Sequence, residues 1–191
     1  RATMGSIFNL PLVSVEHQFI ITEPMSPEVP RSLPTLRDPD RLIYYKEEVG
    51  GLVMGGYEPN PIPWAVDGIP ENFNFRLLQP DWEHFQPTME LAMSRVPALA
   101  EAGIKELVNG PESFTPDGNF ILGPAPGVRG FYVGAGFNAF GIASGGGAGK
   151  VLAEWLVECG ARHLVLSSRS GASTPEAEAF VEKLRGRGIQ T

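Results

Sequence analysis

A stretch rich in glycine is the first part of this sequence whose residue types could do chemistry. It runs from Gly130 to Lys150 (GFYVGAGFNAFGIASGGGAGK), with eight glycines in twenty-one residues, and leads into a segment with helical spacing. Glycine lets the backbone approach a flat ligand closely, and a helix that begins directly behind it presents free N–H groups. The stretch could therefore hold a phosphate, hold the ring of a flat cofactor, or serve as a connecting loop without a ligand.

Two known glycine motifs can be compared with this stretch. A P-loop for nucleoside triphosphates needs a glycine where Ser144 stands and a Ser or Thr where Val151 stands, so that motif is excluded. The dinucleotide fingerprint G-x-G-x-x-G/A is matched by Gly134 to Ala139. Because glycines continue to Gly149, we expect the following helix to begin several residues beyond this match.

Histidine and tyrosine residues are the other candidates for chemistry. The three histidines, His17, His84 and His163, have no metal-ligand spacing, which argues against a zinc site, and each could be a structural histidine. Tyr44 and Tyr45 are adjacent in a strand-like run, so alternation sends their rings to opposite faces and at most one lines a given pocket. No serine stands in a G-x-S-x-G elbow, so nothing points to a hydrolase.

One arginine stands where a cofactor phosphate could bind. Arg169 follows the apolar run His163 to Ser167, within the sequence SSRSG. An arginine near the end of the second strand of a Rossmann unit can bind the ribose 2′-phosphate of NADP. A solvated loop arginine would fit the sequence equally well.

The elements that must position these residues differ between the front and the back of the chain. In the front, β-branched and aromatic runs predict strands, glycine predicts a hairpin turn, and apolar spacing predicts one helix. The expected elements are a strand at Val13 to Glu23, a hairpin of Arg41 to Glu48 with Leu52 to Tyr57, a helix at Trp82 to Val96, and short strands at Ile104 to Val108, Phe120 to Leu122 and Phe131 to Val133. The front is therefore predicted to be antiparallel.

Behind the glycine stretch the pattern changes to helix, strand, helix. The expected elements are a helix at Lys150 to Cys159, a buried strand at His163 to Ser167 and an amphipathic helix at Pro175 to Arg187. The pattern therefore predicts the fold class α+β / α/β, an antiparallel sheet plus a partial Rossmann-like unit; the family resemblance described below implies that the sheet is of the substrate-binding type. We expect the division after residue 130, with the antiparallel sheet and its helices at 1–130 and the partial Rossmann-like segment at 131–191.

The composition narrows the class of protein. With 191 residues, 42% of them apolar, and a formal charge of −7, the chain should be globular and should not bind nucleic acid. No apolar run approaches the roughly 20 residues that span a bilayer, so we expect no membrane insertion. The single cysteine, Cys159, excludes an internal disulfide and fits an intracellular location, either the cytoplasm or the mitochondrial matrix.

Several long stretches resemble one family. VEHQFIITEP, DRLIYYKEEVGGLVMGGYEP, IPENFNFRLLQPDWEHFQPTMELAMSRVPAL and the run from NGPESFTPDG to the helix KVLAEWLVE are similar to the C-terminal part of FAD-dependent amine oxidoreductases related to dimethylglycine and sarcosine dehydrogenases, of the D-amino acid oxidase family. The resemblance covers about residues 11–158. It implies an FAD-binding domain interleaved with an antiparallel substrate sheet.

The same resemblance implies an activity and a site. An N-methyl amine such as dimethylglycine or sarcosine would be oxidised by hydride transfer to the flavin, with His17 and Tyr44 near the substrate amine. The backbone of Gly134, Ala135, Gly136, Phe137 and Asn138 would pass the flavin ring. The family's N-terminal ADP-binding unit has no counterpart among these residues, so we expect FAD to bind weakly or not at all without it.

The tail resembles a second family. From about residue 146 to residue 191, the sequence AEWLVECGARHLVLSSRSGAS and its surroundings are similar to the NADPH-binding start of polyketide synthase ketoreductase domains. This resemblance implies that Gly146, Gly147, Gly149 and Arg169 would hold NADPH. The family's Ser-Tyr-Lys catalytic set is not found here.

Three hypotheses follow. The first is a fragment or chimera of an FAD-dependent amine oxidoreductase, acting on a small-molecule amine and joined by a complementing chain or by copies of itself. The second is the NADPH-binding part of a short-chain-dehydrogenase-type ketoreductase. The third is a catalytically inert piece whose sheet edges bind a partner.

Overall fold

The computed structural model describes residues 2–4, 8–166 and 174–191 of the chain. Two compact units are present, residues 1–119 and residues 120–191. This division lies ahead of the boundary that the sequence suggests at residue 130, and the role of each part stays a prediction.

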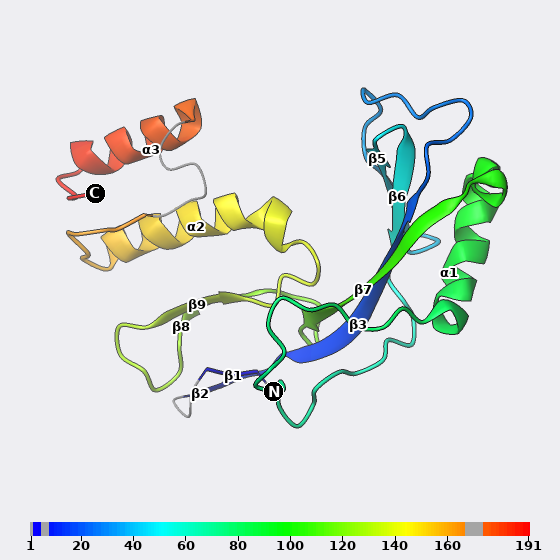
Figure 1. Cartoon of the computed structure of the whole chain (residues 1–191). Helices are drawn as coiled ribbons and strands as arrows, with labels where there is room; N and C mark the ends of the chain where they lie inside the picture. Colours follow the sequence, from blue (N-terminus) through cyan, green and yellow to red (C-terminus); the bar gives the residue numbers. More distant parts are fainter. Residues whose placement is uncertain (1, 5–7, 167–173) are drawn as a thin grey trace. The chain divides into compact units, whose positions relative to one another are not determined.

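A twisted five-stranded antiparallel sheet forms the centre of the first unit (Figure 1). The strand order is β4-β5-β6-β3-β7, so the hairpin of β5 and β6 pairs with the long strand β3. The bounds are β3 Val13–Thr22, β4 Leu36–Asp38, β5 Ile43–Glu48, β6 Gly51–Gly56 and β7 Ile104–Phe114. A separate two-stranded ribbon joins β1 Ala2–Met4 to β2 Phe8–Leu10. The antiparallel front that the sequence predicts is confirmed.

One helix, α1 (Trp82–Arg95), covers one face of this sheet and is followed by a short 3₁₀ helix, η2 (Pro97–Glu101). The helix begins at Asp81, whose carboxylate accepts a hydrogen bond from the His84 backbone N–H at 2.9 Å, an N-cap that satisfies one of the free donors. Phe85 and Ala92 on α1 are fully buried. They pack in one apolar core with side chains from the strands, namely Ile20, Ile43, Tyr45, Met54 and Leu107.

Glycines in β6 allow close packing around the sheet. A Cβ on Gly51 would lie 2.5 Å from the Thr22 hydroxyl oxygen and 2.6 Å from the Glu23 carbonyl oxygen. A Cβ on Gly56 would lie 2.7 Å from the Thr88 methyl carbon on α1. Glycine in a strand interior normally weakens the strand, so these positions have a packing reason.

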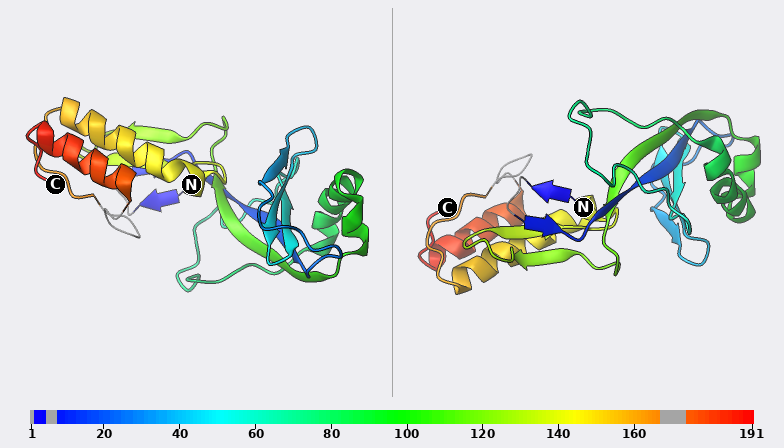
Figure 2. Two further views of the ribbon diagram at one scale, coloured as in Figure 1. Left: turned by 90° about the horizontal axis from the view of Figure 1, so that it is seen from above. Right: turned by 90° about the horizontal axis from the view of Figure 1, so that it is seen from below.

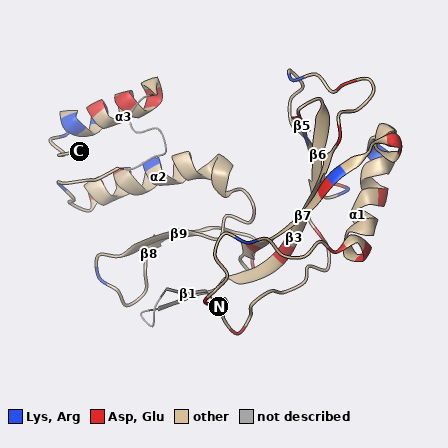
Figure 3. Ribbon diagram, in the orientation of Figure 1, with Lys and Arg blue, Asp and Glu red and all other residues tan. Residues whose placement is uncertain are grey.

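The second unit contains a hairpin and two helices, which Figure 2 shows from above and below. Strands β8 (Ile121–Pro124) and β9 (Tyr132–Ala135) pair antiparallel, and they are followed by helices α2 (Gly141–Glu158) and α3 (Pro175–Gly186). Helix α3 has acidic residues in its first turn and basic residues in its last turn (Figure 3), an order that the helix dipole favours. A small core of Val157, Leu184 and Ile189 joins α2 to α3.

Two local predictions for this unit are wrong. Helix α2 begins at Gly141 and not near Lys150, so the residues Gly145 to Gly149 are helical. The strand expected at His163 to Ser167 is reduced to a single bridge between His163 and Gln190, and Val165 is 99% exposed. A strand needs a paired neighbour, and among the described residues this segment has only that bridge.

Candidate active site

The sheet face opposite α1 carries an aromatic cluster that includes both catalytic candidates. On β3, Gln18 and Ile20 face α1, so alternation turns His17 to the other face. On β5, Tyr45 is buried under α1 and its hydroxyl donates to the Ala92 carbonyl oxygen at 2.9 Å. Tyr44 therefore lies on the face of His17, and the prediction that the two tyrosines separate is confirmed.

Tyr57, directly after β6, links the two candidates. Its ring centroid lies 5.6 Å from that of His17 and 6.4 Å from that of Tyr44. The ring centroid of Phe114, on the neighbouring strand β7, lies 6.2 Å from that of His17. The guanidinium carbon of Arg37, on β4, lies 5.3 Å from the centroid of the Tyr57 ring, within the range of a cation–π contact.

Burial sets the protonation states on this face. Burial lowers the pKa of His17, and the carboxylate of Glu112 only partly opposes this effect. Burial, with the neighbouring Tyr57, raises the pKa of Tyr44 to about 12. A neutral imidazole can accept a proton near neutral pH, while the phenol stays protonated and can donate a hydrogen bond.

Such a set of groups suits an amine that also carries a carboxylate. A neutral imidazole can remove a proton from an ammonium nitrogen, which frees the nitrogen lone pair. A guanidinium at the edge of the cluster can pair with a carboxylate, for which its geometry is well matched. The face therefore offers an acceptor for a proton, a hydroxyl donor and a positive charge within one aromatic cluster.

Sequence reasoning missed three members of this face, Arg37, Tyr57 and Glu112. Tyr57 is the last residue of an expected strand, and Arg37 and Glu112 lie outside the expected elements. Nothing in the sequence says that β6 pairs with β3 across the intervening chain. Extending the observed register by two residues places Tyr57 opposite His17. Once that register is known, Tyr57 can be placed on the face of His17, because it is two residues beyond Gly55 and alternate residues of a strand share a face.

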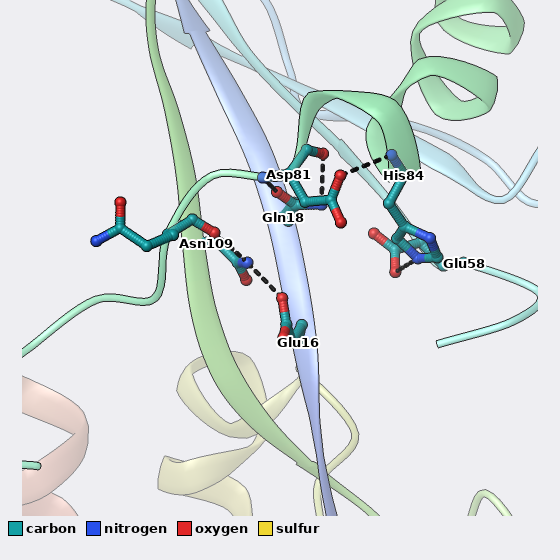
Figure 4. Close-up of polar contacts among 7 residues, drawn as sticks. Glu16, Gln18, Glu58, Asp81, His84 and Asn109 are labelled. Atoms are coloured by element: carbon teal, nitrogen blue, oxygen red, sulfur yellow. Dashed lines mark hydrogen bonds and ion pairs between the residues drawn. The ribbon is translucent and has the colours of Figure 1, made fainter. Parts of the chain in front are cut away.

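A second group of polar side chains lies on the α1 side of the same sheet (Figure 4). The Gln18 amide exchanges two hydrogen bonds with the Asp81 backbone, at 2.8 and 3.2 Å. The Asn109 amide nitrogen donates to Glu16 at 2.6 Å and to the Gln79 carbonyl oxygen at 2.8 Å. These bonds fix the loop before α1 to the two longest strands.

The third contact in this layer is between His84 and Glu58. The His84 Nε2 atom lies 2.9 Å from a Glu58 carboxylate oxygen, beside a cavity of about 550 Å³ that both residues line. Burial raises the pKa of Glu58, an effect that the contact with His84 opposes. His84, which the sequence allows as a structural histidine, thus joins the start of α1 to the residue that follows Tyr57.

The predicted flavin segment forms the connection between β9 and α2. Gly134 and Ala135 end β9, and the backbone is left-handed at Gly136 (φ 67°), Asn138 (φ 52°) and Ala139 (φ 67°). Such φ values are uncommon outside glycine and often occur at ligand sites. The Phe137 ring stacks on Phe120 at 5.3 Å. The tight turn leads into the free N–H groups at the start of α2, so its backbone could face an electron-rich ring edge.

The residues proposed for NADPH are placed differently. Gly146, Gly147 and Gly149 lie inside α2, where backbone N–H groups donate along the helix and are not free to cradle a phosphate. The expected loop at these positions is therefore wrong. Arg169 lies outside the described residues.

Metal sites and membrane-spanning helices are two further classes of feature. Within them, no group of three or more His, Cys, Asp or Glu side chains is arranged to hold a metal ion. Nor does any described helix have the length and apolar character required to cross a bilayer.

Two families match the chain. The family described as DAO, FAD dependent oxidoreductase, matches residues 1–155, and the family described as KR domain matches residues 142–191. The two matches overlap within α2. In the tail, the reducing polyketide synthase FUB1 of Gibberella moniliformis is 51% identical over 45 residues, which are 24% of this chain and 2% of that protein.

Related proteins align with most of the chain. The mitochondrial sarcosine dehydrogenase of Homo sapiens is 43% identical over 148 residues, 78% of this chain and 16% of that protein. The 4-methylaminobutanoate oxidase (formaldehyde-forming) of Paenarthrobacter nicotinovorans is 43% identical over 156 residues, 82% of this chain and 18% of that protein. The chain thus spans less than a fifth of the length of these relatives.

A solved structure shows the same fold. The L-proline dehydrogenase from P. horikoshii superposes with a TM-score of 0.61, at 20% sequence identity, over 96% of this chain and 42% of that protein.

Proposed function

Because the chain belongs to the family of FAD-dependent oxidoreductases, we propose that it takes part in the oxidation of an N-methylated amino acid, such as sarcosine or dimethylglycine. FAD, when bound, would accept a hydride from the N-methyl carbon. Water would then hydrolyse the resulting iminium to formaldehyde and the demethylated amine.

The observation that carries this proposal is the shared sheet face of His17 and Tyr44, bridged by Tyr57. In the proposed site His17 accepts the proton from the ammonium nitrogen, because the hydride can leave only once the nitrogen lone pair is free. The Tyr44 hydroxyl donates a hydrogen bond that orients the substrate, and Arg37 pairs with the substrate carboxylate.

The backbone from Gly134 to Asn138 is the proposed flavin contact. Its support is the left-handed turn at Gly136 and Asn138 directly before α2. The start of a helix favours negative charge, and reduced flavin carries such charge. The sheet unit would then bind substrate and the second unit would contact the cofactor, with a complementing chain or a second copy supplying what these residues do not.

A substrate-binding experiment tests the site directly. Dimethylglycine is titrated into the full chain, with and without added FAD, and binding is followed through the NMR signal of the His17 imidazole. Tyr44→Phe should weaken binding about tenfold through a lost hydrogen bond to a charged ligand. Tyr45→Phe is the matched control, because it removes a hydroxyl from the neighbouring residue on the opposite face. Equal affinity in both variants would count against the proposal.

Cofactor binding has its own test. Purified chain is mixed with FAD and the visible absorbance of the protein fraction is recorded after gel filtration. Retained flavin that is lost in Gly136→Val would support the proposed contact, because valine resists the left-handed backbone at that position. Equal retention by both proteins would contradict it.

A second candidate function, NADPH binding by the tail, is favoured by the match of residues 142–191 to a ketoreductase domain. Its proposed ligands are Gly146, Gly147, Gly149 and Arg169. The helical position of the glycines requires α2 to unwind before they could bind phosphate. Fluorescence titration with NADPH, repeated on Arg169→Ala, decides the matter: the proposal requires measurable affinity and its loss in the variant.

We also propose an intracellular location for the protein, in the cytoplasm or the mitochondrial matrix. The support is the mitochondrial sarcosine dehydrogenase that aligns with most of the chain. Fractionation of cells that express a tagged full-length protein would test this location.

A further inference from the structure

Gly55 lies directly under the ring of Tyr44 in the middle of the sheet. It is opposite Tyr44 on one side and opposite Phe19 on the other. A Cβ placed on Gly55 would collide with the Tyr44 hydroxyl oxygen, would lie 2.5 Å from Tyr44 Cζ and would approach Phe19 Cβ to 3.0 Å. The end of the Tyr44 side chain therefore crosses over β6 toward β3.

The requirement for glycine here is one of space and not of backbone conformation. The glycines with left-handed φ do not include Gly55, so an L-residue could adopt its backbone. Glycine inside a strand also carries a cost, since it adds no packing and loses more conformational freedom on folding. The side chain that occupies the space above Gly55 is the reason for this residue.

We propose that Gly55 is a positioning residue, whose missing side chain lets the phenol of Tyr44 lie across β6 beside Tyr57 and His17. Adjacent strands are about 4.8 Å apart, so a tyrosine on β5 brings its hydroxyl near β3 only if it lies flat over the strand between them. Any larger residue at position 55 must turn the Tyr44 ring away from the cluster. The meaning of this position for substrate binding rests on the function proposed above.

Neighbouring glycines supply matched controls. Gly56 is adjacent but faces α1, where an added Cβ meets the Thr88 methyl carbon and not Tyr44. Gly110 lies opposite His17, and an added Cβ there would make an ordinary contact of 3.7 Å with Leu77. Gly56→Ala therefore reports strain without displacement of Tyr44, and Gly110→Ala reports the effect of a methyl group on the same face.

The first experiment measures where the Tyr44 ring lies. The NMR signals of the Tyr44 ring are recorded with a soluble paramagnetic probe, and contacts between that ring and the Gly55 Hα protons are sought in the unaltered chain. Gly55→Ala should increase the broadening of the Tyr44 ring signals, while Gly56→Ala and Gly110→Ala leave it unchanged. An unmoved, equally protected Tyr44 ring in Gly55→Ala would overturn the proposal.

The second experiment is a double-mutant cycle on stability. Gly55→Ala should lower the folding equilibrium constant roughly 5- to 100-fold, the range expected for an overpacked interior. In the Tyr44→Ala background the same change should cost less than about threefold, because only the approach to Phe19 Cβ at 3.0 Å then remains. An undiminished penalty in that background would refute the inference. If Gly55→Ala does not fold at all, recovery of folding in the double variant is the required result, and its failure is equally decisive.

Substrate binding separates this inference from the proposed function. Gly55→Ala should weaken dimethylglycine binding as much as Tyr44→Phe does, and the combined variant should be no weaker than either. If the unaltered chain binds no amine even with FAD present, the proposed function fails, while the ring position and the cycle still decide the role of Gly55.

Discussion

Strand β6 and helix α2 are both rich in glycine, yet their glycines have opposite surroundings. In β6, an added Cβ on Gly51, Gly55 or Gly56 would lie within 3 Å of another residue. In the first half of α2, an added Cβ on the glycines at 145, 146, 147 and 149 would meet no described atom within 4 Å outside the local helix. The same residue type thus marks crowding in one region and open space in the other.

This difference teaches what glycine means in each region. Crowding around β6 fixes the positions of Tyr44 on one face and of α1 on the other. The open side of α2 imposes no such demand, so its glycines lower helix stability without a packing contact in return. Substitutions to alanine should therefore have opposite signs in the two regions.

The largest expected effect is at Gly51, where an added Cβ would lie too close to a backbone atom as well as to a side chain. Gly51→Ala should destabilise the sheet unit by about 2–3 kcal/mol, because a backbone oxygen of Glu23 cannot turn aside as a side chain could. The measurement is amide hydrogen exchange in β3 and β6, with α2 as the internal reference. Unchanged exchange in β6 would show that the crowding is relieved at no cost.

The opposite sign is expected in α2. Gly147→Ala should stabilise this helix by about 0.5–1 kcal/mol, since alanine has the higher helix propensity and less freedom when unfolded. Slower amide exchange across residues 145–157 would show it, and Gly147→Pro serves as the disruptive counterpart. Faster exchange in the alanine variant would contradict this prediction and would indicate that the added methyl group collides with another residue.

A smaller effect is expected on the pH dependence of stability, through the buried imidazole of His17 on the sheet. Burial lowers the pKa of His17 below its usual 6.5, so below pH 6.5 the unfolded chain binds more protons than the folded one. Stability of the sheet unit should therefore rise with pH up to about 6.5 and be lost as the pH falls through the lowered folded value. His17→Asn should flatten this slope in denaturant titrations, and an unchanged slope would assign it to another group.

The smallest effect is expected on the open side. The Lys183 amine lies 2.7 Å from a Glu154 oxygen between α2 and α3, and it lowers the pKa of that exposed carboxylate. Solvent and salt screen such exposed pairs. Lys183→Met should change the melting of the second unit less than Gly147→Ala does, and the change should shrink further in high salt.

The sequence was enough to predict the longer elements of the sheet unit, but it gave no strand at β4, and β7 extends six residues beyond its expected end at Val108. The strand at Val13 to Glu23, the hairpin around Gly50 and the helix from Trp82 are found within a few residues of their expected bounds. Each rests on local signals, namely alternation, turn glycines and helical spacing. Both family resemblances are confirmed as well.

The errors arise where a local signal competes with contacts between distant segments. The glycines of α2 suggested a loop because glycine has a low helix propensity. The helix nevertheless begins at Gly141, directly after the turn at Asn138 and Ala139. The apolar run His163 to Ser167 suggested a buried strand, but in the described part of the chain only Gln190 pairs with it. The pairing of Tyr57 with His17 could not be found because it depends on sheet order.

Both family matches include part of helix α2. The direction in which a side chain of a helix points depends on its position along the chain. At 3.6 residues per turn, each residue rotates the chain by about 100°. The two matches overlap at residues 142–155. The number of residues in this part of the helix determines whether the Val157 side chain points toward Leu184 and Ile189. One extra residue there would carry that apolar side chain a quarter-turn or more around the axis. A substitution in this part of the helix leaves the direction of Val157 unchanged, whereas an insertion or a deletion changes it.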